Sequence, residues 1–210
     1  MTGGTSVMPL AEQERADLAE LLQGLTPQQW SAPTLCDGWT VRDVVAHMLS
    51  YEERGPAGLA WCFARGLGSF DRTNAIAMAD YADHGPDGLL ALLERSRRPR
   101  GLTAMLGGRI ALTDGMIHQQ DIRRPLDLSR AIPAERLAAA LEVARTAPTL
   151  GASARIRGLR LQATDLDWAT GEGDQITGPG EALLMAIAGR SAALTELSGP
   201  GLPALSGRLH

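Results

Sequence analysis

One predicted helix, over residues 102–123, carries polar residues on the face that should be buried. The stripe consists of Ile110, Asp114, Ile117, His118 and Asp121. These positions follow the helical repeat, so two carboxylates and an imidazole lie among apolar residues. A buried carboxylate needs a cation or a hydrogen-bond network to offset the cost of leaving water. Since Asp114 and His118 are four residues apart, their side chains can chelate one ion.

His47 is a candidate third ligand, on the edge of the apolar face of a helix predicted from Thr40 to about Glu53. Taken alone, it is better explained as a packed histidine. With Asp114 and His118 it makes two imidazoles and one carboxylate, a set that leaves a divalent ion an open position, as catalytic sites do. We therefore expect a metal at these three residues. Asp121 is expected to orient a ligand histidine or to pair with an arginine near the helix end.

The loop before the His47 helix contains Cys36 and Trp39. No second thiol or basic residue stands beside Cys36 in the sequence, so we expect a small buried corner residue rather than a nucleophile. Trp39 should pack at the helix start, where Thr40 begins a capping box. Glu52 and Glu53 are expected to form a solvated helix end.

The first part of the chain is predicted to be a bundle of four antiparallel helices. Their predicted ranges are Pro9–Gly24, Thr40–Glu53, Asp87–Arg98 and Leu102–Arg123. Between the second and third, residues 57–84 are expected to form a long connection with a short helix near Leu59–Arg65.

The composition changes after Pro133. A helix is predicted over residues 133–145, then alternating strands with turns at Gly171 and Gly173, and then another helix over residues 178–199. Residues 202–209 are expected to return as an edge strand. The fold class is therefore α+β: a metal-binding four-helix bundle over residues 1–130 and a small α/β domain over residues 131–210.

Composition excludes several functions. The net charge of −4 disfavours nucleic acid. All 20 basic residues are arginine, which removes Schiff-base lysines and the P-loop lysine. The 2 cysteines are too few for a disulfide framework, and both are expected to be reduced thiols.

No stretch approaches a membrane span or a secretory signal, so we expect a cytoplasmic protein. We also expect it to be a monomer or a homodimer.

Four motifs resemble the mycothiol-dependent maleylpyruvate isomerase family of the DinB/YfiT-like metal-binding superfamily. They are W-x2-P-T-x-C-D-G-W-T-V-R-D-V-V-A-H from Trp30 to His47, D-G-M-I-H-Q-Q-D-I from Asp114 to Ile122, D-W-x-T-G-x-G from Asp167 to Gly173, and G-P-x-E-A-L-L-x-x-I-A-G-R ending at Arg190. The resemblance spans nearly the whole chain. It implies a DinB-like bundle followed by a C-terminal domain of the maleylpyruvate isomerase type.

The resemblance also implies residue roles. His47, Asp114 and His118 match the family's ligands for a divalent metal, usually zinc, and Arg190 matches an arginine near the active site. Asp114 stands where the family has glutamate, and its side chain is one methylene shorter. Three alternatives follow: Asp114 binds the metal through a water molecule, it binds a different ion, or Asp121 takes its place as the carboxylate ligand.

The implied function is activation of a small thiol, such as mycothiol, for isomerisation or S-transfer on a small electrophilic substrate. Arg190 would hold a substrate carboxylate in a bidentate fork, or it is simply an arginine at a helix C-terminus. Two other functions stay open. One is a non-catalytic protein that binds a small ligand or metal, and the other is a metal-dependent hydrolase that uses the same ligands.

Overall fold

The computed structural model describes residues 6–52, 54 and 56–209. The chain divides into two compact units, Met1–Ser129 and Arg130–His210. The first unit is helical and the second contains a three-stranded sheet, so the chain is an α+β protein. Among the described residues, no helix is long and apolar enough to cross a membrane.

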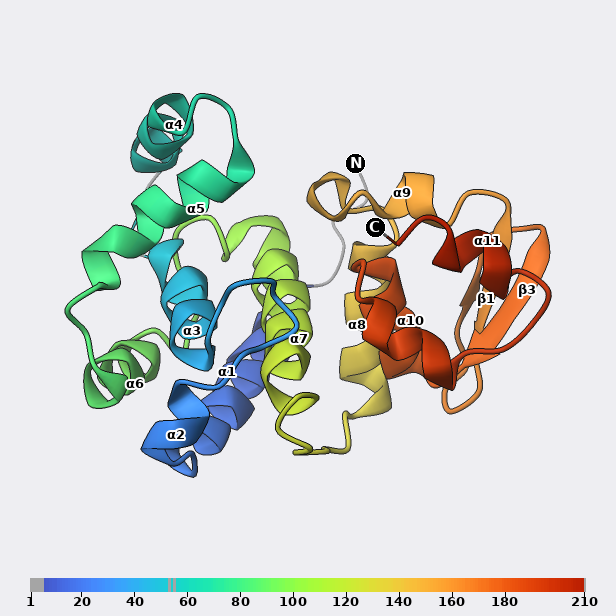
Figure 1. Cartoon of the computed structure of the whole chain (residues 1–210), viewed down its shortest axis with the longest axis horizontal. Coiled ribbons are helices and arrows are strands. Elements are labelled where there is room, and N and C mark those ends of the chain that lie inside the picture. Colours follow the sequence, from blue (N-terminus) through green and yellow to red (C-terminus); the bar gives the residue numbers. More distant parts are fainter. Residues whose placement is uncertain (1–5, 53, 55, 210) are drawn as a thin grey trace. The chain divides into compact units, whose positions relative to one another are not determined.

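In the described part of the first unit, the regular elements are helices (Figure 1). They are α1 (Met8–Gln23), α2 (Pro27–Trp30), α3 (Val41–Ser50), α4 (Pro56–Arg65), α5 (Phe70–Met78), the short 3₁₀ helix η1 (Ala79–Tyr81), α6 (Pro86–Arg95), the 3₁₀ segment η2 (Met105–Gly108) and α7 (Arg109–Arg123). α1 and α3 each pack against both α6 and α7. The apolar core between α1, α3 and α6 contains Leu18, Leu22, Val45, Leu49 and Leu89.

The start of α3 confirms the predicted capping box. The side chain of Thr40 accepts from the backbone N–H of Asp43, and the Asp43 carboxylate accepts from the N–H of Thr40. This arrangement satisfies amides at the helix start that have no partner within the helix. α3 ends at Ser50, earlier than the predicted Glu53, which lies outside the described residues.

α7 begins at Arg109, so the prediction that this helix starts at Leu102 was wrong. Just before it, Leu106, Gly107 and Gly108 have φ values of 56°, 69° and 86°, which break a right-handed helix. Because apolar residues continue through this turn, the sequence pattern did not indicate the break in the predicted helix.

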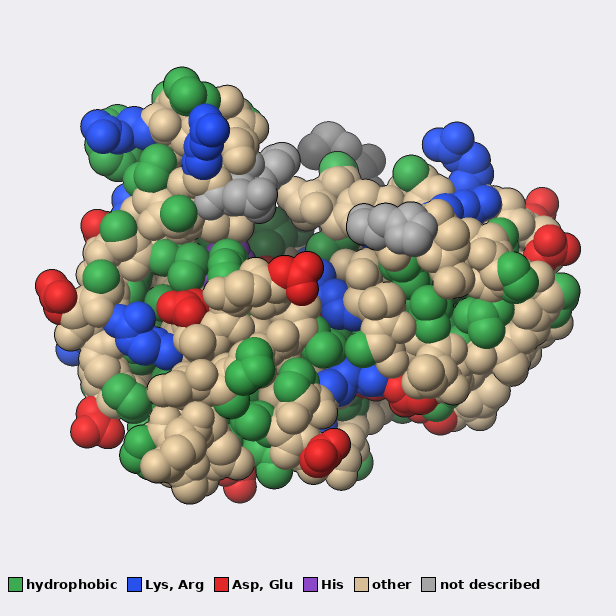
Figure 2. Space-filling view, in the orientation of Figure 1, with side chains coloured by type: hydrophobic (Ala, Val, Ile, Leu, Met, Phe, Trp, Pro, Cys, Tyr) green, Lys and Arg blue, Asp and Glu red, His purple; other side chains and the backbone are tan. Residues whose placement is uncertain are grey.

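The predicted long connection between α3 and α6 is mostly helical. α5 occupies its second half and packs against both α4 and α3. Trp61 and Phe63 on α4 are 53% and 43% exposed, and Figure 2 shows hydrophobic and basic side chains together on this helix. The guanidinium of Arg65 lies 5.0 Å from the centroid of the Trp61 ring, a cation–π distance.

Glu52 is buried rather than solvated, which contradicts the sequence prediction. Its carboxylate pairs with the guanidinium of Arg15 on α1 and accepts a hydrogen bond from the Thr103 hydroxyl. It also accepts from the backbone N–H of Arg100 at 2.8 Å, and Arg15 donates to the carbonyl of Ser96 at 2.6 Å. These partners replace the water that Glu52 gives up.

The second unit places a small sheet against helices. Its elements are α8 (Ala134–Ala144), η3 (Pro148–Leu150), α9 (Ala152–Arg155), β1 (Leu159–Ala163), β2 (Ala169–Thr170), β3 (Asp174–Gly178), α10 (Gly180–Ile187), η4 (Ser191–Glu196) and α11 (Leu202–Ser206). The strand order is β2-β1-β3, with β1 antiparallel to β2 and parallel to β3. Alternate residues of β1 are buried, as predicted, and α10 packs on β1 and β3.

Two glycines allow the chain to pass from β2 to β3 around the start of β1. Gly171 and Gly173 have φ values of +76° and +120°. A Cβ atom would lie 2.2 Å from the carbonyl oxygen of Leu159 at Gly171, and 2.2 Å from that of Gly158 at Gly173. Any larger residue would therefore clash with the backbone at this crossing.

The predicted edge strand over residues 202–209 was wrong, because this segment contains helix α11. Pro203 stands in its first turn, where a residue without an N–H is tolerated, whereas the same residue would interrupt a strand ladder. At the edge of β3, Thr177 pairs instead with Ser198 in an isolated antiparallel bridge.

Candidate metal centre

α7 brings Asp114 and His118 together, one turn apart. Oδ1 of Asp114 lies 3.5 Å from Nε2 of His118. The His118 side chain is 11% exposed and that of Asp114 is 35% exposed. The carboxylate side of the imidazole is therefore accessible to solvent, while the ring itself is buried.

His47 reaches the same place from α3. Its ring centroid lies 5.0 Å from that of His118, with the two ring planes almost perpendicular. One ligand atom from each of His47, Asp114 and His118 lies within 4.8 Å of the other two. The three residues predicted as metal ligands therefore converge, from two helices, on one small region.

Two aromatic rings hold His47 in place. The Trp39 ring is 4.8 Å from it, and the Tyr51 ring meets it edge-on at 5.2 Å. The Tyr51 hydroxyl donates to Oδ1 of Asn74 on α5 at 2.5 Å. Burial, followed by the charges of Asp114 and Cys62, raises the pKa of Tyr51 to about 12, so its phenol is neutral at physiological pH.

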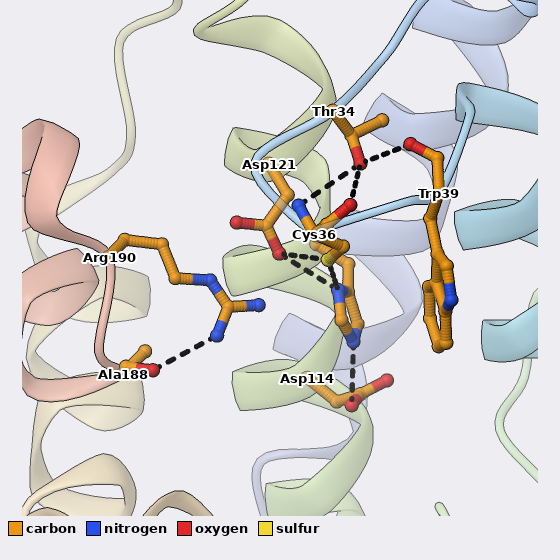
Figure 3. Close-up of polar contacts among 8 residues, drawn as sticks. Thr34, Cys36, Trp39, Asp114, Asp121, Ala188 and Arg190 are labelled. Carbon is orange, nitrogen blue, oxygen red and sulfur yellow. Dashed lines mark hydrogen bonds and ion pairs between the residues drawn. The ribbon is translucent and has the colours of Figure 1, made fainter. Parts of the chain in front are cut away.

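The other ring nitrogen of His118 faces Asp121, which is fully buried. Nδ1 of His118 lies 3.0 Å from Oδ2 of Asp121. The Cys36 thiol donates to the same Oδ2 at 3.2 Å (Figure 3), and its sulfur is 3.7 Å from Nδ1 of His118. The two nitrogens of His118 therefore face two different groups of potential metal ligands. Asp114 and His47 lie on one side of the ring, and Asp121 and Cys36 lie on the other.

His118 has a strongly perturbed acidity. Burial alone lowers its pKa, but Asp114, Asp121 and the hydrogen bond to Cys36 outweigh burial and raise the pKa to about 10. In the metal-free protein, His118 is therefore an imidazolium ion at neutral pH. The negative surroundings that stabilise this proton attract any cation, a metal ion included.

Two groups of donors among the described residues meet the spacing of a metal site. One is His47, Asp114 and His118, and the other is Cys36, His118 and Asp121. They share His118 but use opposite sides of its ring. Only the first had been predicted as a ligand set.

Arg190 lies in the second unit, just after α10. Its Nη1 donates to the carbonyl of Ala188 at 3.0 Å. Burial and the charge of Arg190 both lower the pKa of Arg155, whose guanidinium donates to the carbonyl of Ile187 at 2.5 Å. Two guanidinium groups therefore influence each other within this unit.

Sequence reasoning missed the roles of Cys36 and Tyr51 in this cluster. Cys36 was predicted as a small corner residue, yet it is half-buried and hydrogen-bonded to Asp121, 85 residues away. The available signal was its position in the loop that leads into the His47 helix. For Tyr51, the spacing of four residues from His47 was visible in the sequence, because such residues are neighbours on a helix.

The helical unit, with its two histidines and a carboxylate converging from two helices, defines a protein with a candidate metal centre in a helical domain. Residues 11–105 match the family model of the mycothiol maleylpyruvate isomerase N-terminal domain. This match confirms the resemblance to the mycothiol-dependent maleylpyruvate isomerase family that was stated from the sequence motifs. The matched segment contains Cys36 and His47, whereas Asp114, His118 and Asp121 follow it on α7.

Two solved structures are similar over most of the chain. A crystal structure of a histidine-to-alanine mutant of the mycothiol-dependent maleylpyruvate isomerase has a TM-score of 0.55 and 14% sequence identity, covering 92% of this chain and 91% of that chain. A further crystal structure of the mycothiol-dependent maleylpyruvate isomerase has a TM-score of 0.52 and 15% identity, with the same coverage. At this identity the likeness establishes a shared fold. No curated protein sequence matches the chain.

Proposed function

We propose that the chain is a divalent-metal-dependent enzyme that activates a low-molecular-weight thiol for isomerisation or S-transfer on a small electrophile. The observation that carries the proposal is the approach of ligand atoms from His47, Asp114 and His118 to within 4.8 Å of one another. The family match over residues 11–105 supports mycothiol, or a similar small thiol, as the thiol cofactor.

The residues fit a divalent metal such as zinc. Imidazole nitrogen and carboxylate oxygen are zinc ligands, and three of them leave a position for a small molecule. The shorter side chain of Asp114 still reaches within 3.5 Å of Nε2 of His118, so we assign Asp114 rather than Asp121 as the carboxylate ligand. A dication at this site would take the place of one proton that His118 holds in the metal-free protein.

The domain types proposed with this function are a DinB-like four-helix bundle formed by α1, α3, α6 and α7, and a second domain of the maleylpyruvate isomerase C-terminal type. The packing of α1 and α3 against α6 and α7 supports the first assignment. The proposed boundary between the two domains lies after residue 130, and the two compact units of the structure divide after Ser129.

When bound, the metal stabilises the anionic form of a thiol at its open position and so supplies a thiolate at neutral pH. The chain's own residues prepare this site. Asp121 accepts a hydrogen bond from Nδ1 of His118, so Nε2, on the side of Asp114, is the nitrogen that would bind the metal. Trp39 and Tyr51 flank the His47 ring and restrict its orientation. No cysteine of the chain is needed as the nucleophile.

We further propose that Arg190 binds a carboxylate of the substrate. A guanidinium group matches a carboxylate with two parallel hydrogen bonds, and this geometry fixes the orientation of the substrate as well as its charge.

The test combines metal analysis with a thiol assay on the purified full-length protein. We expect about one zinc per chain by elemental analysis. We also expect turnover of an electrophile that requires both the metal and mycothiol, with maleylpyruvate, the substrate in the name of the similar structures, as the first one tried. Isomerisation would regenerate the thiol, whereas S-transfer would consume it. His47→Ala and His118→Ala should lose metal and turnover together. A protein that binds no metal would favour a binding protein, and bound zinc without thiol turnover would favour a hydrolase.

A further inference from the structure

The loop that leads into α3 is a turn closed by several hydrogen bonds. Within it, the backbone N–H of Thr34 donates to the carbonyl of Trp39 at 3.0 Å, and the N–H of Trp39 donates to the carbonyl of Cys36 at 3.0 Å. The hydroxyl of Thr34 accepts from the N–H of Cys36 at 3.1 Å. Gly38, with φ +75°, supplies the left-handed residue that closes the turn. The direction of the Cys36 side chain is therefore set by the backbone.

The same loop is attached to α7 at the candidate metal centre. The backbone N–H of Leu35 donates to the carbonyl of Asp121 at 3.1 Å. One residue later, the Cys36 thiol donates to the side-chain Oδ2 of Asp121 at 3.2 Å. Asp121 is thus held by both its backbone and its carboxylate, and its side chain is 0% exposed.

The position of the Asp121 carboxylate decides what His118 can do. Oδ2 lies 3.0 Å from Nδ1 of His118, so a proton on Nδ1 is shared with this oxygen. That bond leaves Nε2 as the nitrogen available to a metal. If the carboxylate turned away, His118 would lose the acceptor that fixes both its tautomer and its ring orientation.

From this chain of contacts, and resting on the proposed function, we infer that Cys36 is a positioning residue of the metal site. Its thiol holds the carboxylate of Asp121, and Asp121 holds His118 ready for the metal. The loop thereby acts on both histidines, since Trp39 packs on His47 while Cys36 acts on His118 through Asp121. Cys36 contributes here as a hydrogen-bond donor and does not react.

The experiment measures zinc affinity of the full-length protein by competition with a chromogenic chelator. Cys36→Ala removes the donor, and Cys36→Ser keeps a donor in the same place. Cys62→Ala is the matched control, because Cys62 is the other thiol of the same unit and is more deeply buried. We expect Cys36→Ala to weaken zinc binding about tenfold, the lower end of the effect of outer partners of metal ligands. Cys36→Ser and Cys62→Ala should stay close to the parent protein.

A second measurement follows the Nδ1 proton of His118 by NMR in the zinc-loaded protein. The parent and the serine variant should show a protected low-field resonance, and Cys36→Ala should lose it through exchange with water. Zinc binding by Cys36→Ala equal to that of the parent would overturn the role of Cys36 alone. Equal weakening in Cys62→Ala, or no rescue by serine, would also overturn it. Failure of the parent protein to bind zinc would instead overturn the proposed function.

Discussion

Two buried charged clusters of the helical unit differ in their charge balance. In the first, Arg15 and Glu52 face each other with side chains 5% and 1% exposed, one cation against one anion. In the second, the carboxylates of Asp114 and Asp121 flank the single imidazole of His118, and Asp114 keeps 35% of its side chain exposed. The first cluster pairs one cation with one anion deep in the unit, and the second gathers two carboxylates around one imidazole, with one carboxylate open to solvent.

The difference shows how to separate a structural ion pair from a candidate site. Around Glu52, the hydroxyl of Thr103 and the N–H of Arg100 complete the hydrogen bonds, and the pair joins α1 to the end of α3. Around His118, the carboxylate of Asp114 is partly exposed to solvent, so a cation can reach it. Full burial of a matched pair favours stability, whereas a carboxylate that stays open to solvent beside buried imidazoles favours binding.

The largest effect on stability should come from the cluster of Arg15 and Glu52. Glu52→Gln leaves the Arg15 guanidinium buried without its counter-ion, and breaking a buried pair in this way costs about 3–5 kcal/mol. Chemical denaturation of the metal-free protein measures this loss, and zinc affinity should not change. A loss below about 1 kcal/mol, the value of an exposed pair, would contradict the structural role.

In the cluster around His118, a substitution should weaken zinc binding and leave the fold intact. His118→Ala removes a ligand common to both donor groups, so we expect zinc binding to weaken by at least about 100-fold, the upper limit of what outer partners cause. Circular dichroism should show a folded helical protein. His84→Ala, a histidine elsewhere in the same unit, is the control and should bind zinc normally. Unchanged affinity in His118→Ala would place the metal elsewhere.

In the second unit, the guanidinium of Arg190 is proposed to bind a carboxylate of the substrate. Arg190→Lys keeps the charge but loses the planar fork. For a carboxylate substrate we expect kcat/KM to fall about 10- to 100-fold, the loss of one charge-assisted hydrogen bond, with zinc content unchanged. Steady-state kinetics with elemental analysis measure both quantities. A lysine variant with parental kinetics would remove Arg190 from substrate binding.

The pH dependence of stability sharpens the contrast within the metal-free protein. The folded-state pKa of His118 is about 10, above its ordinary value of 6.5, so the folded protein holds a proton that the unfolded chain releases. This contribution to stability is complete below about pH 6.5 and is lost as the pH rises toward 10. Urea denaturation across this range should show a gradual fall, and His118→Gln should remove it. Stability independent of pH in the parent would contradict the assignment.

Local patterns predicted much of the fold. The capping box at Thr40, the alternation of β1 and the helices near α1, α6 and α8 depend on residues close in sequence. The four-residue spacing of Asp114 and His118 likewise predicted neighbours on one helix face, and the two side chains lie 3.5 Å apart. Such features follow from the helical and strand repeats alone.

Features that depend on distant partners were not predictable in the same way. Glu52 had every local sign of a solvated helix end, but its partner Arg15 lies 37 residues earlier. Cys36 meets Asp121 across 85 residues, so its role as a donor was invisible until α7 was placed beside the loop. The start of α7 was missed because three consecutive positive φ angles leave the apolar pattern unchanged.

The most direct test is anomalous diffraction at the zinc edge from crystals of the zinc-loaded protein. We expect one peak, bound by His47, Asp114 and Nε2 of His118 at about 2.0–2.2 Å, with Asp121 still hydrogen-bonded to Nδ1. A zinc ion bound instead by Cys36, with a sulfur distance of about 2.3 Å, would contradict the proposed centre and assign the metal to the opposite side of the His118 ring.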